Sequence, residues 1–194
     1  MERYASISRE TKETKVMVQL NLDGGGVEIS TGVGFFDHML SAFAIHSGFG
    51  LKVETVGDWH VDCHHTIEDT GIVLGKAFAE ALITKDGIVR FGNAYIPMDE
   101  ALGFAAADIS GRPYLNFCAE FPQEKIGDFD TCMTEEFFRA FAMNAEITLH
   151  LECRYGKNSH HMVEALFKAA AHALRVAIGY SGNGSVLSSK GVLS

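Results

Sequence analysis

The sequence has no long hydrophobic run and no basic cluster. Its longest apolar stretch, near residues 165–178, is interrupted by Lys168, His172 and Arg175, so no segment is suited to spanning a bilayer. The formal net charge is -9, and lysines and arginines form no block. A chain of this kind does not attract a nucleic-acid backbone or an anionic membrane surface. We therefore expect a soluble protein whose partner is a small molecule or another protein chain.

Further absences bear on compartment and domain layout. The start, MERYASISRE, lacks the basic-then-apolar layout of a secretory signal. The four cysteines form no CxxC pair, a distribution that favours reduced thiols over a disulfide framework. There are only three prolines in 194 residues, and no proline- or serine-rich linker divides the chain. These observations predict a cytoplasmic protein with one shared core.

The first half of the chain contains strand-like and helical patterns in turn. KVMVQLNL and VEIS alternate apolar and polar residues on either side of the turn DGGG, which predicts a hairpin. FFDHMLSAFAIHS changes to helical spacing and ends at Gly48, and LKVETV and WHVDC are strand-like. A helix then runs from His64 to the turn at Asp86 and Gly87, with one apolar stripe made of Ile67, Gly71, Leu74, Phe78 and Leu82.

The second half repeats this order. Strand-like runs occur at IVRFGNAYI, ALGFAAADI and PYLNFCAEF, followed by a helix over about 133–146, the strand ITLHLECR and a helix from His160. A period near half the chain indicates a duplicated unit, whereas a solenoid needs at least about 3 shorter repeats. We predict an α+β fold of two duplicated half-domains, about 1–86 and 87–180, with two mixed sheets packed with helices around one shared core. The turn-rich tail, 181–194, is expected to become ordered over a bound substrate.

Two histidine-rich motifs, HHTIED at residues 64–69 and HHMVEA at residues 160–165, open corresponding helices. On a helix, the first histidine and the glutamate four residues later lie about 40° and one turn apart, while the second histidine is rotated by about 100°. One such motif alone is more often a cap or a surface feature. Its duplication predicts two metal ions, each drawing on both halves, with ligands from His64, His65, Glu68, His160, His161 and Glu164. Imidazole and carboxylate without thiolate favour a six-coordinate ion such as Mn²⁺ over structural zinc.

Two further residues are candidates for completing these ligand sets. His38, in the first helix of the first half, and Glu136, in the equivalent helix of the second half, could each join one ion; alone, each would be an ordinary polar helix residue. The other histidines are not assigned to metal. We expect His46 at a helix C-terminus, His60 and His150 on strands, and His172 at a solvated helix position.

Basic residues near turns suggest a site for an anion. Arg90, Arg112 in SGRPY and Lys190 in the tail could bind phosphate together, because guanidinium groups match phosphate oxygens. Taken singly, each is more simply a solvated surface charge. The run at Gly24–Gly26 opens no helix, so it is typical of a turn and not of a phosphate-binding loop.

Motifs along almost the whole chain resemble the imidazoleglycerol-phosphate dehydratase family. They are TKET, NLDG, FFDHML, GDWHVDCHHTIED, RFG, DEA, SGRPY, EEFF, GKNSHHMVEA and SSKGVLS. The resemblance implies a duplicated unit of the kind seen in a ribosomal protein domain and a homo-oligomer of twenty-four subunits built from trimers, with active sites between subunits. It also implies two Mn²⁺ ions per site, held by His38, His64, His65, Glu68, Glu136, His160, His161 and Glu164. Helix geometry groups His64 with Glu68 on one ion and His160 with Glu164 on the other.

The implied reaction converts imidazoleglycerol phosphate to imidazole acetol phosphate and water, a step of histidine biosynthesis. No carbonyl activates the carbon-bound proton, so the ring would be held between the ions as an imidazolate and would expel the hydroxyl to give a diazafulvene. Glu13, in TKET, resembles the family's acid/base residue and contacts the substrate; His65, Glu68, His161 and Glu164 are the expected catalytic ligands. The phosphate would be bound by Arg90, Arg112, Ser188, Ser189 and Lys190.

Two positions depart from the family's pattern, and two other functions stay open. Some members carry His where this chain has Glu136, and the extra negative charge here changes one metal site. Some carry Gln where this chain has Ala42, so one polar contact to the substrate is missing. A two-metal phosphohydrolase would also use paired ions, to activate water for attack on phosphorus. A non-enzymatic metal-binding shell protein would use the histidines for storage or assembly, but would leave Glu13, Arg90 and Arg112 without a role.

Overall fold

The first half forms a sheet with two helices. The computed structural model describes residues 2–182, 187 and 188. Strands β1 (Tyr4–Glu10), β2 (Thr14–Asn21), β3 (Val27–Ser30) and β4 (Gly50–Gly57) form a sheet in the order β1-β2-β4-β3. All neighbours are antiparallel except β3 and β4, which are parallel. Along β2, every second residue is buried, as the alternating pattern predicts.

The predicted hairpin of KVMVQLNL and VEIS is wrong, because β4 lies between β2 and β3. The glycine-rich turn carries the chain past the end of β4. A Cβ atom added to Gly50 would meet the carbonyl oxygen of Gly24 at 2.6 Å and Cα of Gly25 at 2.8 Å. Gly24 and Gly25 also have positive φ angles, 115° and 145°. Glycine is therefore required here for a close backbone approach as well as for the turn.

The predicted strand at WHVDC is also wrong. Residues 58–63 form turns before α2, and the N–H of Val61 donates to the carbonyl oxygen of Asp58 at 2.9 Å. The Asp62 carboxylate accepts a hydrogen bond from the backbone N–H of His64 at 2.7 Å. Such aspartate contacts to nearby backbone favour a turn over a strand.

The helices agree with the sequence patterns. Helix α1 (Gly34–Ser47) ends at Gly48, whose φ angle of 78° is left-handed and whose N–H bonds back to Ala44. Helix α2 (His64–Leu82) buries its predicted stripe, Ile67, Gly71, Leu74, Phe78 and Leu82. Both helices therefore begin and end close to their predicted limits.

The second half repeats the topology of the first. Strands β5 (Phe91–Met98), β6 (Ala101–Asp108), β7 (Tyr114–Cys118) and β10 (Thr148–Tyr155) have the order β5-β6-β10-β7, and again one pair, β7 with β10, is parallel. The helices are α3 (Met133–Asn144) and α4 (Ser159–Ala177). A small hairpin of β8 (Lys125–Ile126) and β9 (Phe129–Asp130), which the sequence patterns did not predict, precedes α3.

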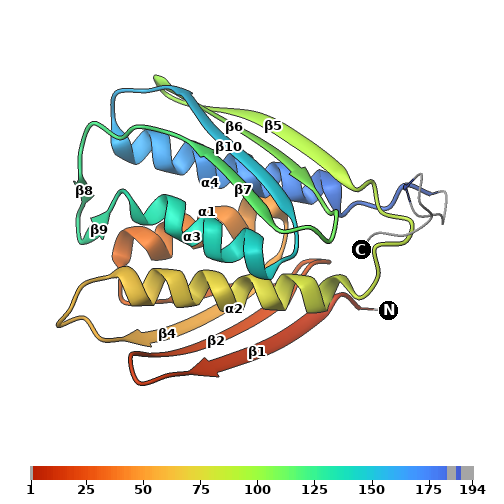
Figure 1. Ribbon diagram of the computed structural model, residues 1–194, viewed down its shortest axis with the longest axis horizontal. Helices are drawn as coiled ribbons and strands as arrows, with labels where there is room; N and C mark the ends of the chain where they lie inside the picture. Colours follow the sequence, from red (N-terminus) through yellow and green to blue (C-terminus); the bar gives the residue numbers. More distant parts are fainter. Residues whose placement is uncertain (1, 183–186, 189–194) are drawn as a thin grey trace.

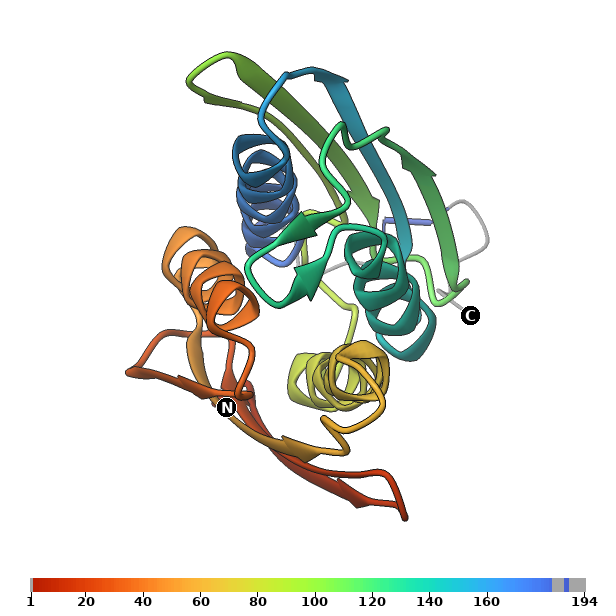
Figure 2. The ribbon, with the colours of Figure 1, turned by 90° about the vertical axis from the view of Figure 1, so that its left-hand side faces the viewer.

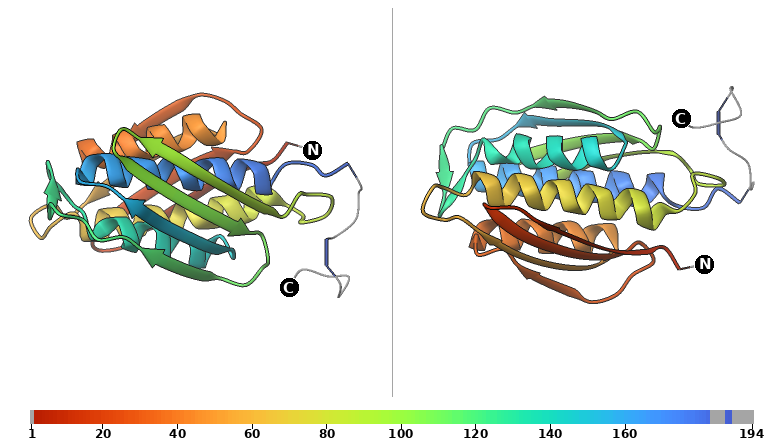
Figure 3. Two further views of the ribbon diagram at one scale, coloured as in Figure 1. Left: turned by 90° about the horizontal axis from the view of Figure 1, so that it is seen from above. Right: turned by 60° about the horizontal axis from the view of Figure 1, so that its bottom comes forward.

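The two sheets lie on the outside and the helices lie between them (Figure 2). Helices α1 and α2 cover the first sheet, α3 and α4 cover the second, and the pairs α1–α4 and α2–α3 join the halves, as Figure 3 also shows. Phenylalanines of all four described helices meet in one core: Phe36, Phe43, Phe78, Phe137, Phe138, Phe141 and Phe167. The α+β fold of duplicated halves with one shared core is thus confirmed. In the described part of the chain, no helix combines the length and apolarity needed to cross a membrane.

Candidate metal centre

The clearest cluster of ligand atoms lies at the start of α4. His160 Nε2 is 3.3 Å from Glu164 Oε2, and His38 Nε2, on α1, is 3.7 Å from the same oxygen. Ligand atoms of these three residues all lie within 4.8 Å of one another, the one such set found among the described residues. His38 comes from the first half, and His160 and Glu164 come from the second. They meet because α1 packs against α4. The cluster therefore mixes the halves.

Lys168 holds the carboxylate of this cluster. It lies one turn after Glu164 on α4, and its Nζ is 2.7 Å from Glu164 Oε1, leaving Oε2 toward the histidines. Burial by itself would raise the pKa of Glu164, but the Lys168 hydrogen bond and the nearby His38 and His160 outweigh it and lower the pKa. Sequence reasoning missed this lysine, although its spacing of four from a glutamate on a helix was visible.

The first-half motif forms a more open pair. His64 Nε2 lies 3.8 Å from Glu68 Oε2 at the start of α2. Glu136 is on α3, which packs against α2, but its described ion pair is with Arg139, whose Nε is 3.8 Å from Glu136 Oε2. No described contact joins Glu136 to His64 or Glu68. The geometry of one chain thus supports His64 and Glu68 as ligands of one ion. It gives no such support for Glu136 as a ligand beside them.

The second histidine of each motif is oriented by a carboxylate at its Nδ1 atom. In the first half, His65 Nδ1 is 3.1 Å from each carboxylate oxygen of Asp58. In the second half, His161 Nδ1 is 2.7 Å from Glu100 Oε2. The hydrogen bonds that these two imidazoles donate to Asp58 and Glu100 raise the pKa values of His65 and His161. Because each Nδ1 is engaged, Nε2 is the nitrogen that faces outward, as is usual for a histidine that binds metal.

Glu100 is fixed from two sides. Its Oε1 accepts hydrogen bonds from the backbone N–H groups of Lys157 at 3.0 Å and Asn158 at 2.8 Å, in the loop before α4. The His161 hydrogen bond, followed by these backbone donors, lowers the pKa of Glu100 to about 2. No role for Glu100 or Asp58 was predicted from the sequence, although both lie in motifs that carry the family resemblance, DEA and GDWHVDCHHTIED.

Another carboxylate lies near each outward-facing nitrogen. Glu13 Oε2, in the turn between β1 and β2, is 4.0 Å from His65 Nε2. Asp99 Oδ2, in the turn between β5 and β6, is 3.7 Å from His161 Nε2. The structure therefore brings Glu13 close to the first-half motif, at a distance from which its exposed side chain can reach a ligand bound there.

The two arginines of the predicted anion site, Arg90 and Arg112, lie around Asp108. Arg90 donates to both Asp108 oxygens, at 2.7 Å from Nε and 3.1 Å from Nη2, while Arg112 Nη2 lies 3.9 Å from Oδ2. Arg90 Nη1 also donates to the carbonyl oxygen of Leu187 at 2.5 Å, which brings Ser188 to the same region. Ser189 and Lys190 lie outside the described residues. Two arginines of the predicted set therefore lie together.

Within one chain, the histidines and the arginines are far apart. The N–H of Arg90 donates to the carbonyl oxygen of Ala177, the last residue of α4, whereas His160 is in its first turn. At 1.5 Å per residue, the two ends of this helix are separated by about 25 Å. Helices α2 and α4 run in the same direction (Figure 1), so both histidine motifs lie at the end remote from Arg90. One chain therefore does not bring the predicted metal ligands and the predicted phosphate site together.

Two expectations for the remaining histidines are wrong. His172 is not simply solvated, because its Nε2 lies 3.1 Å from Nδ1 of His46 across the α1–α4 contact. Burial, then the charges of Lys168 and His172, lower the pKa of His46. His60 lies in the turn after β4 and not on a strand, for the reason given above for WHVDC. His150 is on β10 with its side chain exposed, as expected.

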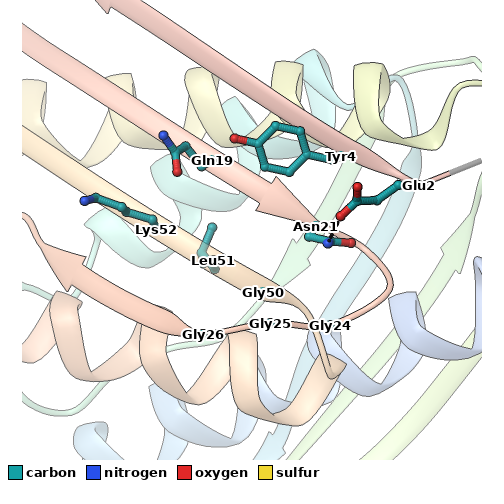
Figure 4. Close-up of a pocket in the computed structure, with 10 residues that line it drawn as sticks. All are labelled: Glu2, Tyr4, Gln19, Asn21, Gly24, Gly25, Gly26, Gly50, Leu51 and Lys52. Atoms are coloured by element: carbon teal, nitrogen blue, oxygen red, sulfur yellow. Dashed lines mark hydrogen bonds between the residues drawn. The ribbon is translucent and has the colours of Figure 1, made fainter.

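A pocket on the first sheet is unrelated to these residues. Figure 4 shows it beside the glycine-rich turn, lined by Glu2, Tyr4, Gln19, Asn21, Gly24, Gly25, Gly26, Gly50, Leu51 and Lys52. It contains no histidine or cysteine, and Asn21 there donates a hydrogen bond to Glu2 at 2.8 Å. A second pocket, lined by Gln123, Lys125, Ile126, Lys157, Asn158 and His160, adjoins the cluster at the start of α4.

The chemistry and spacing of the histidine–carboxylate cluster fit a divalent metal ion. Its donors are imidazole nitrogens and a carboxylate, without thiolate, a set that suits Mn²⁺ and similar ions. With bonds of about 2.1 Å, two ligands of one ion are at most about 4.2 Å apart. The distances of 3.3 Å and 3.7 Å to Glu164 satisfy this limit.

Comparisons with known proteins agree with this site. The imidazoleglycerol-phosphate dehydratase family matches residues 31–174. Dehydratases of that name from Phenylobacterium zucineum and Bacillus cereus are 57% and 58% identical, covering 100% and 98% of this chain and 100% of each relative. Crystal structures of the enzymes from Staphylococcus aureus and Pyrococcus furiosus superpose with a TM-score of 0.84 each, at 44% and 40% identity, over 91% and 96% of this chain and 99% and 100% of theirs. The chain therefore belongs to the imidazoleglycerol-phosphate dehydratase family, whose members are metal-dependent hydro-lyases of histidine biosynthesis.

Proposed function

We propose that this dehydratase acts through two Mn²⁺ ions that hold the imidazole ring of imidazoleglycerol phosphate. The observation that carries the proposal is the repeated His-His-x-x-Glu motif at matched helix starts, with His38 beside the second copy. The proposed ligands are His38, His64, His65, Glu68, Glu136, His160, His161 and Glu164. Their nitrogen and carboxylate donors, without thiolate, support a six-coordinate ion such as manganese over a closed structural zinc site.

The chemical difficulty is the carbon-bound proton, which has no neighbouring carbonyl to acidify it. When bound, the two ions supply Lewis acidity that favours an imidazolate ring, whose electrons can then expel the neighbouring hydroxyl. Glu13 is the proposed acid/base residue. Its carboxylate is 4.0 Å from His65 Nε2 and its side chain is 57% exposed, so it can turn toward a substrate without breaking a buried contact.

Arg90 and Arg112 are proposed to bind the substrate phosphate, together with Ser188, Ser189 and Lys190. The Asp108 carboxylate already fixes the Arg90 guanidinium, while the Arg112 side chain is 61% exposed and free to turn toward a phosphate. Closure of the tail, 181–194, would exclude water and fix the ring between the ions.

The active site is proposed to form between subunits, in an assembly of twenty-four chains in the cytoplasm. Supporting this, the histidine motifs and Arg90 lie at opposite ends of α4, so one chain cannot hold the ring and the phosphate of one small molecule. Exposed aromatic residues on the outer face of the second sheet, Phe91, Tyr95 and Tyr114, offer apolar surface for contacts between copies.

The direct test uses chelator-stripped protein and imidazoleglycerol phosphate. We expect ketone formation on addition of Mn²⁺ and none without it. A two-metal phosphohydrolase would release inorganic phosphate instead, and a storage or shell protein would bind Mn²⁺ without consuming the substrate. Either of these results, with no ketone, contradicts the proposed function.

A further inference from the structure

The two halves orient the second histidine of their motifs with carboxylates from different elements. Asp58, at the Nδ1 atom of His65, lies in the loop between β4 and α2. Glu100, at the Nδ1 atom of His161, lies in the turn between β5 and β6. If these contacts were only a remnant of the duplication, the same element of each half would supply the carboxylate. The common result, a carboxylate at Nδ1, points to a requirement of the histidines themselves.

The repeated topology identifies the counterpart of Glu100 in the first half. Strand β2 begins at Thr14 and β6 at Ala101, and these strands occupy the same place in the two sheets. Both strands begin with a buried residue and then alternate. Glu13 and Glu100 directly precede them. Glu13 therefore corresponds to Glu100, although their contacts differ.

The contacts show how the two glutamates have diverged. Glu100 is engaged by His161 Nδ1 and by two backbone N–H groups. Glu13 instead lies 4.0 Å from the other nitrogen, Nε2, of His65, because Asp58 already occupies its Nδ1 atom. The side chain of Asp58 is 15% exposed and that of Glu13 is 57% exposed, so the positioning carboxylate is the enclosed one.

We propose that Asp58 and Glu100 are positioning residues that accept the Nδ1–H of His65 and His161, and that this role of Asp58 leaves Glu13 free for proton transfer. Each carboxylate keeps the proton on Nδ1, so that Nε2 carries the lone pair for a metal ion. The inference rests on the proposed metal centre, but it concerns a tautomer and can be tested by metal binding without turnover.

Replacing each carboxylate by its amide distinguishes this role from a structural one. In Glu100→Gln, the backbone N–H groups of Lys157 and Asn158 require the amide oxygen at the Oε1 position. The amide NH₂ group then faces His161 Nδ1 and donates to it, which moves the imidazole proton to Nε2 and blocks the metal ligand. The isosteric amide should therefore be at least as harmful as Glu100→Ala.

Asp58→Asn should behave in the opposite way. Both Asp58 oxygens are 3.1 Å from His65 Nδ1, and no other described hydrogen bond fixes which oxygen faces the ring. The amide can present its oxygen to Nδ1–H and preserve the tautomer. Asp58→Ala removes the acceptor altogether and should weaken the metal site.

The experiment is a Mn²⁺ titration of the stripped full-length protein by calorimetry, with thermal unfolding of each metal-free variant as a check of folding. We expect Glu100→Gln, Glu100→Ala and Asp58→Ala to weaken one class of Mn²⁺ site by about 10–100-fold. Asp58→Asn should stay within about threefold of wild type, as should Glu54→Ala, a control that removes an exposed carboxylate from β4. If a Glu100 variant does not fold, the difference in Mn²⁺ affinity between Asp58→Asn and Asp58→Ala still tests the inference.

Wild-type affinity in Glu100→Gln, or equal losses in Asp58→Asn and Asp58→Ala, would overturn the inference. These outcomes are separate from the proposed function. Altered Mn²⁺ affinities in the expected order, in a protein that forms no ketone, would leave the positioning role standing and remove the dehydration mechanism. Full turnover with unaltered affinities would do the reverse.

Discussion

Each histidine in the paired motifs has two ring nitrogens, and its neighbours decide which one is available. His160 presents Nε2 to Glu164 within the cluster at the start of α4, whereas His65 and His161 are fixed through Nδ1. Residues that were not part of the sequence motif thus decide how the motif can work. The same principle separates Glu13, whose carboxylate is exposed, from the engaged Glu100.

Glu13→Gln should lower the turnover number by about 10²–10⁴-fold, because the amide cannot carry a proton. Its Mn²⁺ affinity should stay close to that of wild type, since Glu13 lies beside a ligand and is not proposed as one. Steady-state kinetics and calorimetry provide the two measurements, and Glu10→Gln, an exposed change at the end of β1, is the matched control. Unchanged turnover would remove Glu13 from the mechanism.

Asp23 gives a prediction on pH and stability. The Arg3 guanidinium, 2.8 Å away from Nε to Oδ1, holds the pKa of Asp23 below its ordinary value of 3.8. A lowered pKa in the folded state means that this pair contributes stability above the unfolded pKa and loses it as the pH falls through the folded value. Wild type should therefore keep its advantage over Asp23→Asn down to about pH 5 and lose it progressively between about pH 5 and about pH 2. Parallel denaturation midpoints across that range would contradict this.

The helices and most strands could be predicted because their patterns are local. The α2 stripe and the Gly48 stop depend only on spacing and on backbone preference. The β2–β3 hairpin failed because the insertion of β4 between these strands depends on tertiary pairing, which alternation does not encode. In the site, the motifs indicated the histidines, but Glu100 is 61 residues from His161, so the contact between them could be identified only from the folded chain.

Gly75 allows the close contact between helices α2 and α3. A Cβ atom on Gly75 would lie 2.6 Å from the carbonyl oxygen of Phe141 and 2.9 Å from the backbone nitrogen of Ala145. Alanine favours a helix over glycine by about 1 kcal/mol, but backbone atoms cannot move aside as side chains do. We expect Gly75→Ala to lower the free energy of unfolding by about 1–3 kcal/mol.

Denaturant unfolding measures this change, and Gly34→Ala is the control, because a Cβ atom on Gly34 meets nothing within 4 Å. Gly34→Ala should leave the free energy of unfolding nearly unchanged or slightly higher. A Gly75→Ala variant as stable as Gly34→Ala would show that the helices separate at little cost.

The two predicted binding sites, the metal centre and the phosphate site, lie at opposite ends of the chain. Duplication puts both histidine motifs at one end, and the C-terminal end of α4 puts Arg90 and the start of the tail at the other. A small substrate with a ring and a phosphate then requires ends from different chains. Assembly is, in this account, a condition for catalysis.

Complementation between two impaired variants tests this arrangement. His160→Ala should abolish turnover and weaken assembly, and Arg112→Ala should raise the Michaelis constant because phosphate binding is lost. Co-expressed in one cell, the two variants should form mixed assemblies in which some sites take the intact histidines from one chain and the intact arginine from another. Activity at low substrate should exceed that of either variant alone. Mixed assemblies without any recovered activity would mean that each chain supplies a whole site.

The most direct measurement is anomalous diffraction from crystals containing Mn²⁺ and an unreactive analogue of the substrate. We expect two manganese peaks, each within bonding distance of one nitrogen of the analogue's ring, with His160, Glu164 and His38 around one of them and the phosphate beside the arginines of a neighbouring chain. A ring far from any manganese ion, or both ions at the phosphate, would contradict this expectation.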